Sequence, residues 1–200
     1  MSTCRCKYPK SIKKKNITII EDGKGQRCYK IAFDLGVQGS NILVISRAPK
    51  GLEEDSCNSL YKRIVKFLIE NKEEIGGIKK LTVVNLFAIY EYDKEELYEE
   101  CLLKGKDYIE GNDNELYNDK IIAEEIHEAD YVIAAWGEPL EGLEQIYVSR
   151  VELVLKSLRH EIMNYSERKY ILRVGDVSKK GYPKHCLAWS YKDKLQTLFE

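Results

Sequence analysis

The sequence lacks any apolar run near the length of a membrane span, which takes about 18 or more consecutive apolar residues. The segment after Met1 also lacks the apolar core of about 7–15 residues found in secretory signal peptides. We therefore expect a cytoplasmic protein without membrane contact. The formal net charge of −1 gives neither a basic excess pointing to nucleic acid nor an acidic excess pointing to a disordered tail.

Closely spaced metal ligands are scarce as well. The six cysteines are scattered, and only Cys4 and Cys6 lie near one another. A zinc site normally needs a second such cysteine pair or paired histidines. None of His127, His160 and His185 is paired with a cysteine at the spacing of zinc ligands. We expect no metal ion and no other cofactor, with cysteines that stay reduced in the cytosol and mostly pack as small apolar side chains.

Several motifs of nucleotide-binding and hydrolytic enzymes are missing. No glycine-rich loop ends in Gly-Lys-Ser or Gly-Lys-Thr, which excludes a P-loop NTPase. Gly23 and Gly25 lie inside an expected hairpin rather than before a helix, so they form no dinucleotide fingerprint. Neither the Gly-x-Ser-x-Gly elbow of α/β-hydrolases nor the zinc motif of base deaminases occurs.

What remains is the composition of one globular domain. The chain has 200 residues, of which 44% are hydrophobic and 32% charged, and domains typically span roughly 100–200 residues. Residues 1–15 form a basic arm, which we interpret as a solvated, disordered terminus, with contact to phosphates as the alternative. Residues 16–200 are expected to form a single α/β domain.

Short extended and helical segments alternate along this domain. Residues 16–21 and 27–35 alternate in polarity around Gly23 and Gly25, which predicts a β-hairpin at a sheet edge. Continuous apolar runs predict strands buried on both faces at 41–46, 80–87, 130–136 and 169–174. Helices are expected at 57–74, 94–104, from 112 to about 127, after Pro139, and at 191–199. The alternation implies a three-layer α/β/α sandwich with a mainly parallel sheet and an antiparallel edge hairpin.

Ligands of open parallel sheets bind beyond the carboxyl ends of the strands. At these ends the sequence places Ser46 with Arg47, then Asn85 followed by Phe87, then Trp136 with Gly137, and finally the loop leading to His185. We expect these residues to converge on one edge of the sheet. Asn85 and Trp136-Gly137 would form the floor of a base-sized pocket, with His185 above it.

Asn85 and His185 each allow two interpretations. A buried amide must find partners, either loop backbone or a ligand's paired donor and acceptor, as a nucleobase edge offers. His185 is either an exposed loop residue or a donor and general acid–base with a pKa near working pH.

Arg47 and the two aromatic residues also have structural alternatives. Arg47 could hold a phosphate or carboxylate, or could pair with the acidic residues 53–55. Phe87 and Trp136 could stack on a planar ligand, or belong to the core.

The order of the segments VVNLFAIYEYDKEEL, GNDNEL, YVIAAWG, a helix with Arg150, and GDVSKKGYPKH resembles the bacterial and phage family called domain of unknown function 1643. The resemblance covers about residues 27–190 and adds Asn112, Asp113 and Arg150 to the ligand-binding candidates. The chain departs from the family where Asn-Pro-Ser-like, Asp-Pro-Thr-like and His-Pro-Leu segments are expected. These places read Ser46-Arg47-Ala48-Pro49, Asp55-Ser56-Cys57 and His185-Cys186-Leu187.

In motif order the chain is also similar, more remotely, to uracil-DNA glycosylases. Both have a proline-containing turn after the first core strand, an Asn ending the next, a Trp-Gly after the third, and a final His loop. The resemblance implies that Asn85 reads a pyrimidine edge and that His185 stabilises leaving-group charge, which makes both catalytic candidates. The water-activating acid of that superfamily has no counterpart, because Asp55 lies too far along. Electrostatic stabilisation alone can still support catalysis.

Three functions therefore stay open. The pocket could bind a free nucleobase or nucleotide, or a flipped or single-stranded base of nucleic acid, and hydrolyse a glycosidic bond. It could instead sense a nucleotide or modified base without turnover. Finally, the chain could be a protein-interaction component of a phage or defence system, with tyrosines such as Tyr90, Tyr92 and Tyr98 at its contact surface. No oligomeric state follows from the sequence.

Overall fold

The computed structural model describes residues 12–49, 56–90, 94–165 and 169–199. Most of the basic arm, the acidic residues 53–55 and Tyr92 lie outside the described residues, as do Cys4 and Cys6. None of the described helices has both the length and the apolar character needed to cross a membrane.

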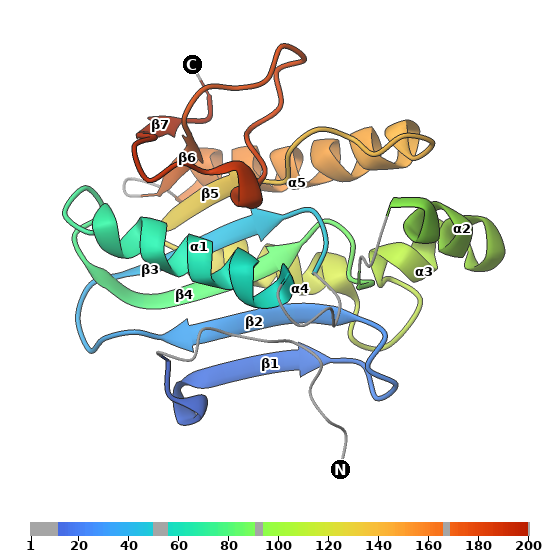
Figure 1. The fold of residues 1–200 in the computed structure, drawn as a ribbon, viewed down its shortest axis with the longest axis horizontal. Coiled ribbons are helices and arrows are strands. Elements are labelled where there is room, and N and C mark those ends of the chain that lie inside the picture. Colours follow the sequence, from blue (N-terminus) through green and yellow to red (C-terminus); the bar gives the residue numbers. More distant parts are fainter. Residues whose placement is uncertain (1–11, 50–55, 91–93, 166–168, 200) are drawn as a thin grey trace.

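The strands form one seven-stranded sheet in the order β1-β2-β4-β3-β5-β6-β7 (Figure 1). Its centre consists of parallel strands: β4 (Ile78–Asn85), β3 (Ser40–Ser46), β5 (Tyr131–Ala135) and β6 (Tyr170–Val174). β1 (Ile17–Glu21) and β2 (Cys28–Asp34) form an antiparallel hairpin, and β2 also pairs antiparallel with β4. A mainly parallel sheet with an antiparallel N-terminal hairpin at its edge is thus confirmed. The other edge is β7 (Leu195–Thr197), antiparallel to β6.

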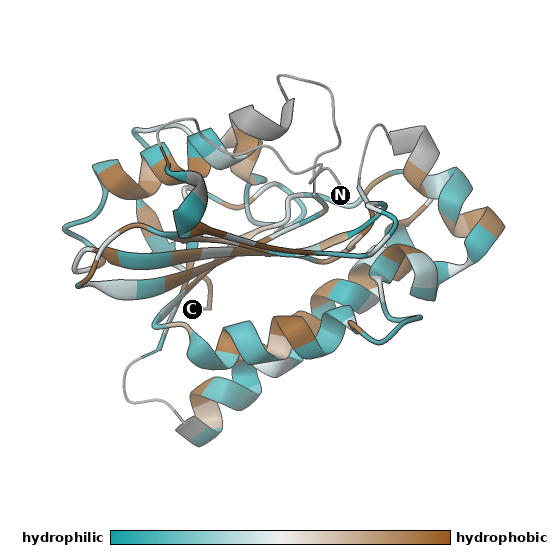
Figure 2. Cartoon of the chain, turned by 90° about the horizontal axis from the view of Figure 1, so that it is seen from below, coloured by the Kyte–Doolittle hydropathy of each residue, from teal (hydrophilic) through white to brown (hydrophobic). Residues whose placement is uncertain are grey.

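Helices lie on both sides of this sheet (Figure 2). They are α1 (Ser56–Glu70), α2 (Lys94–Lys104), α3 (Lys106–Glu110), α4 (Asn118–Glu128) and α5 (Glu144–Tyr165), with 3-10 turns η1 (Lys14–Asn16) and η2 (Cys186–Ala188). One apolar cluster joins one face of the sheet to α1, and a second joins the opposite face to α4 and α5.

Alternate residues of each central strand enter opposite clusters. Leu43 and Ile45 of β3 face α4 and α5, whereas Ile42 and Val44 face α1. Because side chains of a strand point alternately to the two faces, a strand covered on both must be apolar at every position. Each fully buried side chain of this kind contributes roughly 1.5–3 kcal/mol by leaving water. The continuous apolar runs of the sequence follow from this two-sided burial.

Some predicted elements are wrong in kind or extent. The tail 191–199 is not a helix, since Leu195–Thr197 pairs with β6, whose backbone groups on that side would otherwise be unpaired. The helix expected from residue 112 begins at Asn118, and the residues before it form turns. Helix α1 ends at Glu70 rather than near 74, and the short helix α3 was not expected.

Candidate functional site

The carboxyl ends of three parallel strands lie side by side, as predicted. Ser46, the last residue of β3, is in register with Asn85 of β4 on one side and with Ala135 of β5 on the other. The arrowheads of β3 and β4 reach the same edge of the sheet (Figure 1). Because residues in register on parallel strands point to the same face, Asn85 and Ser46 project toward the face that α1 covers.

The loop after β6 packs onto this edge through Gly137. Gly137 has φ 75°, and a Cβ added to it would lie 2.8 Å from the Cβ of His185. The absence of a side chain therefore allows the loop to sit directly on the end of β5. The Nδ1 atom of His185 accepts a hydrogen bond from the Leu187 amide at 3.3 Å. A neutral His185 in this arrangement carries its proton on Nε2.

Cys186 follows His185 and lies against Ser46. Its Sγ is 3.4 Å from Ser46 Oγ, and both side chains are fully buried. Burial raises the pKa of the Cys186 thiol to about 11, although the hydrogen bond with Ser46 and the charge of Arg47 oppose the rise. The thiol is thus kept protonated and poorly nucleophilic. Arg47 is close enough to act on this thiol, while its predicted acidic partners lie outside the described residues.

The side-chain amide of Asn85 has an unused donor. Asn85 is 2% exposed, and its Nδ2 has no hydrogen-bond partner among the described residues. Its backbone oxygen accepts from Asn118 Nδ2 at 3.1 Å. A buried polar group left without a partner costs roughly 1–3 kcal/mol. The loop backbone predicted as the structural partner of this donor is not found in the described part of the chain.

Phe87 and Trp136 lie on the other side of the sheet. Both belong to the cluster that contains α5, and the rings of Phe87 and Tyr147 are 6.3 Å apart. The Tyr147 hydroxyl donates to the carbonyl oxygens of Trp136 and Gly137. Trp136 is 1% exposed. The two aromatic side chains are core residues here, and the structure does not bring Trp136 together with the Asn85 side chain.

Arg150 and Asn112 belong to a buried polar network between α4 and α5. Arg150 pairs with Asp119, and Glu110 lies 3.9 Å from its Nη1. Asn112 Nδ2 bonds Asp119 at 3.0 Å and Glu110 at 3.4 Å. Burial raises the pKa of Glu110, and the Arg150 charge offsets only part of that rise.

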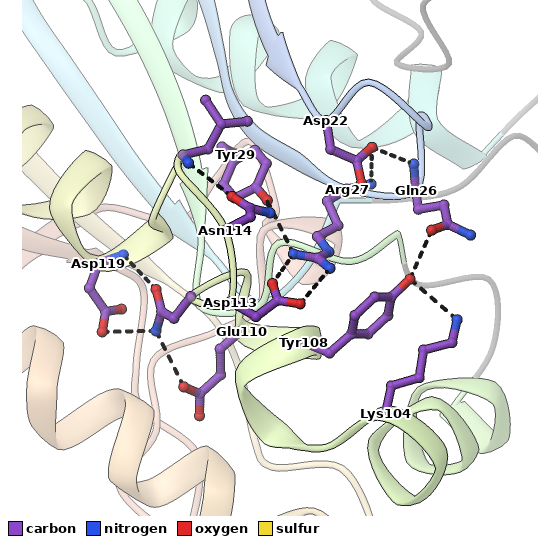
Figure 3. Close-up of polar contacts among 12 residues, drawn as sticks. Asp22, Gln26, Arg27, Tyr29, Lys104, Tyr108, Glu110, Asp113, Asn114 and Asp119 are labelled. Carbon is purple, nitrogen blue, oxygen red and sulfur yellow. Dashed lines mark hydrogen bonds and ion pairs between the residues drawn. The ribbon is translucent and has the colours of Figure 1, made fainter.

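Asp113 lies apart from both groups, at the turn of the hairpin. It forms a two-bonded ion pair with Arg27, whose guanidinium also lies 4.1 Å from the centre of the Tyr108 ring (Figure 3). These residues line an open surface pocket of about 500 Å³. Since Asp113 is already paired, its role in the structure is to fasten the loop before α4 to Arg27, the residue before β2.

The predicted ligand residues therefore separate into groups. Asn85, Gly137, His185 and Arg47 gather at the carboxyl edge. The aromatic pair and the Arg150 network lie behind this edge on the α4 and α5 side of the sheet, and Asp113 lies at the hairpin turn. Sequence reasoning missed Cys186 and Asn118 as partners of this edge. Ser46 ends an apolar strand just as Asn85 does, and the sequence placed it at this edge although it was not chosen as a ligand-binding candidate. Among the described residues, no group of acidic, histidine and cysteine side chains could hold a metal ion.

The sequence of the chain matches one protein family. Residues 29–187 match the family described as "Protein of unknown function (DUF1643)". The chain belongs to this family. The resemblance predicted from the segment order is thus confirmed. The matched part of this DUF1643 chain runs from β2 to η2, so it includes every residue gathered at the carboxyl edge. No curated protein and no solved structure gives a significant match to this DUF1643 chain.

Proposed function

We propose that this DUF1643 protein binds a nucleobase or nucleotide at the carboxyl edge of β4, β3 and β5, and that the Asn85 amide hydrogen-bonds the base. The proposal includes the finer architecture, a three-layer sandwich of the uracil-DNA-glycosylase kind, and a cytoplasmic location. Its ligand is free, or is a flipped or single-stranded base of nucleic acid.

The observation that carries the proposal is the buried Nδ2 of Asn85 without a partner in the described part of the chain. Native structures leave few such groups, and an acceptor on a ligand would satisfy this one. The neighbouring hydroxyl of Ser46 and the imidazole of His185, whose backbone and Cβ pack on Gly137, add donors and acceptors at the same edge. An amide with flanking polar groups suits the alternating donors and acceptors of a base.

Glycosidic hydrolysis is the reaction that these groups would support. Water adds across the bond, so that its hydroxyl joins the sugar carbon and its proton ends on the departing base. A base leaving as an anion gains charge in the transition state, and His185 would stabilise that charge through Nε2–H. His185 and Asn85 are the catalytic candidates in this scheme.

A sensor without turnover is the second candidate. Among the described residues, no carboxylate hydrogen-bonds Asn85 Nδ2 or the Ser46 hydroxyl, which favours binding without hydrolysis. A binding site without a general base would recognise the ligand and release it unchanged.

Thermal denaturation with a panel of nucleobases, nucleosides and nucleotides tests binding. A ligand at 100 times its dissociation constant adds about 2.7 kcal/mol of stability. Asn85→Ala should raise the dissociation constant at least about tenfold, since it removes a buried hydrogen bond to the ligand. Asn164→Ala is the matched control, because Asn164 is exposed on α5 and its Nδ2 donates to the His160 carbonyl of the same helix.

Chromatography of the free base released from nucleosides and uracil-containing DNA separates the two candidates. Release that Asn85→Ala and His185→Ala abolish supports the hydrolase. A thermal shift without release supports the sensor. If no member of the panel shifts the melting temperature, the proposed binding is wrong.

A further inference from the structure

Two consecutive backbone carbonyls at the end of β4 are held by side chains from the helices behind the sheet. Asn118 Nδ2, at the start of α4, donates to Asn85 O at 3.1 Å. Arg150 Nε, on α5, donates to Leu86 O at 3.0 Å. Both side chains are buried. The peptide units that follow Asn85 are therefore fixed from the face opposite to the one its side chain enters.

Arg150 is itself held in place on α5. Asp119 pairs with its guanidinium, and Asp119 is fixed in turn by Asn112, whose Oδ1 accepts from the Asp119 amide at 3.1 Å. A fork-shaped guanidinium with a fixed carboxylate partner has little freedom to rotate. The orientation of Nε toward Leu86 O follows from this arrangement.

The loop that carries these groups is fastened to β2. Asp113 pairs with Arg27, and Asn114 Nδ2 donates to the Tyr29 hydroxyl at 2.6 Å (Figure 3). Gly111 packs so closely that an added Cβ would lie 2.6 Å from the Cβ of Ala88, just beyond the end of β4. The segment after Asn85 is thus enclosed by a loop with contacts on both sides.

A network of this kind is not explained by stability alone. Buried ion pairs rarely stabilise a fold more than well-packed apolar residues would, since removing charges from water is costly. In some other proteins such networks contribute conformational specificity instead. Arg150 donates to a main-chain carbonyl on the α5 side, which also leaves it poorly placed to touch a ligand at Asn85.

We propose that Asn118 and Arg150 are positioning residues, which fix the end of β4 so that the Asn85 amide faces its ligand. The positioning role rests on the proposed function, because it concerns the same site. It replaces the prediction that Arg150 contacts the ligand.

Backbone hydrogen exchange, measured by NMR on the full chain without ligand, tests this role. The reporters are the amides of Leu86 and Phe87, which donate to Ser46 O and Arg47 O at 2.9 Å. Remote reporters are Ser40 and Asp130 at the opposite end of the sheet, which donate to Gly77 O and Asn41 O. In Asn118→Ala and Arg150→Met, exchange at Leu86 and Phe87 should rise at least about tenfold more than at the remote amides.

Lys169→Met is the matched control. Lys169 is also a cation with a largely covered side chain that donates to main-chain carbonyls, but to those of Ile126 and His127 at the far end of α4. Lys169→Met should raise the exchange rate of the Asp130 amide. The exchange rates of the Leu86 and Phe87 amides should stay as they are in the wild type. If Arg150→Met does not fold, Asn118→Ala decides, since it keeps every ion pair of the network.

The outcomes separate the two proposals. An equal rise at both ends of the sheet, or none at Leu86 and Phe87, overturns the positioning role whatever the ligand screen gives. Conversely, the proposed function is wrong if no nucleobase or nucleotide of the panel shifts the melting temperature. The exchange pattern would still show whether Asn118 and Arg150 hold the end of β4. Where a nucleotide does bind, its dissociation constant should rise at least about tenfold in Asn118→Ala, as in Asn85→Ala. An unchanged dissociation constant in Asn118→Ala would refute the positioning role of Asn118.

Discussion

Replacing Gly137 by alanine tests whether this glycine lets the His185 loop sit on the end of β5. An L-residue at φ 75° costs roughly 1–2 kcal/mol. The new Cβ would lie 2.8 Å from His185 Cβ and 3.4 Å from its backbone N, so the loop must shift or strain. Overpacking of this kind costs roughly 1–3 kcal/mol. We expect Gly137→Ala to lower the free energy of unfolding by roughly 2–5 kcal/mol in urea denaturation.

Gly76→Ala separates the cost of an L-residue at positive φ from the cost of overpacking. Gly76 has φ 68°, and the contact a Cβ there would make within the described part of the chain is with Ser40 Oγ at 3.9 Å, an ordinary distance. Its loss should therefore stay near the backbone cost of roughly 1–2 kcal/mol. Adding His185→Gly to Gly137→Ala removes the shortest contact and should recover part of the loss, measured as a coupling energy. Equal losses for the two glycine variants, with no coupling to His185, would refute the packing explanation.

Other predictions concern the buried polar groups. Because burial raises the pKa of Cys186 from 9.0 to about 11, its thiolate fraction at pH 8 should fall about 100-fold. Mass spectrometry should show slow alkylation of Cys186 by iodoacetamide in the native protein and fast alkylation in denaturant; equal rates would contradict this. Burial also raises the pKa of Glu110, so the folded state binds its proton more tightly and stability is lost as pH rises from 4.5 through the folded pKa. Glu110→Gln should therefore stabilise the protein relative to wild type in urea denaturation at pH 7, with a gain that shrinks toward pH 4.5; a gain independent of pH would argue against this. Asp113→Asn leaves Arg27, 5% exposed, without its carboxylate. Since the Asp113 side chain is 37% exposed, urea denaturation should give a loss of about 1–3 kcal/mol, below that of a fully buried pair, and no loss would mean the pair contributes nothing.

The central strands could be predicted because two-sided burial leaves a pattern in the sequence. Every position from Ile42 to Ile45 is apolar, since each faces one of two covered surfaces. The strand Leu195–Thr197 leaves no such pattern. It spans three residues of intermediate or high exposure, and its pairing with β6 depends on a contact more than twenty residues away along the chain. Propensity within the segment carries no information on that pairing.

The start of α4 could not be predicted for a different reason. Asn112, Asp113 and Asn114 are residue types that commonly begin helices, since their side chains accept from free amides. Here Asp113 pairs with Arg27 and Asn114 Nδ2 donates to the Tyr29 hydroxyl, while Asn114 Oδ1 accepts from the Leu116 amide in a turn that precedes the helix. The helix begins only at Asn118, after Tyr117 at φ 40°. These residue types predicted a helix start at 112, but α4 begins at Asn118 without a side-chain cap at Tyr117, because the three side chains bond to other partners.

The face to which a strand-end residue points is hidden from the sequence in a sheet that is apolar on both sides. Asn85 and Trp136 each end an apolar run, and nothing in either run distinguishes one face from the other. The register decides it. Asn85 aligns with Ser46 and Ser46 with Ala135, so Trp136, one residue further, points the opposite way. A planar ligand bound by Asn85 would therefore find its aromatic neighbours on the α1 side, where Tyr90 packs, and replacing Trp136 should affect the core before it affects binding.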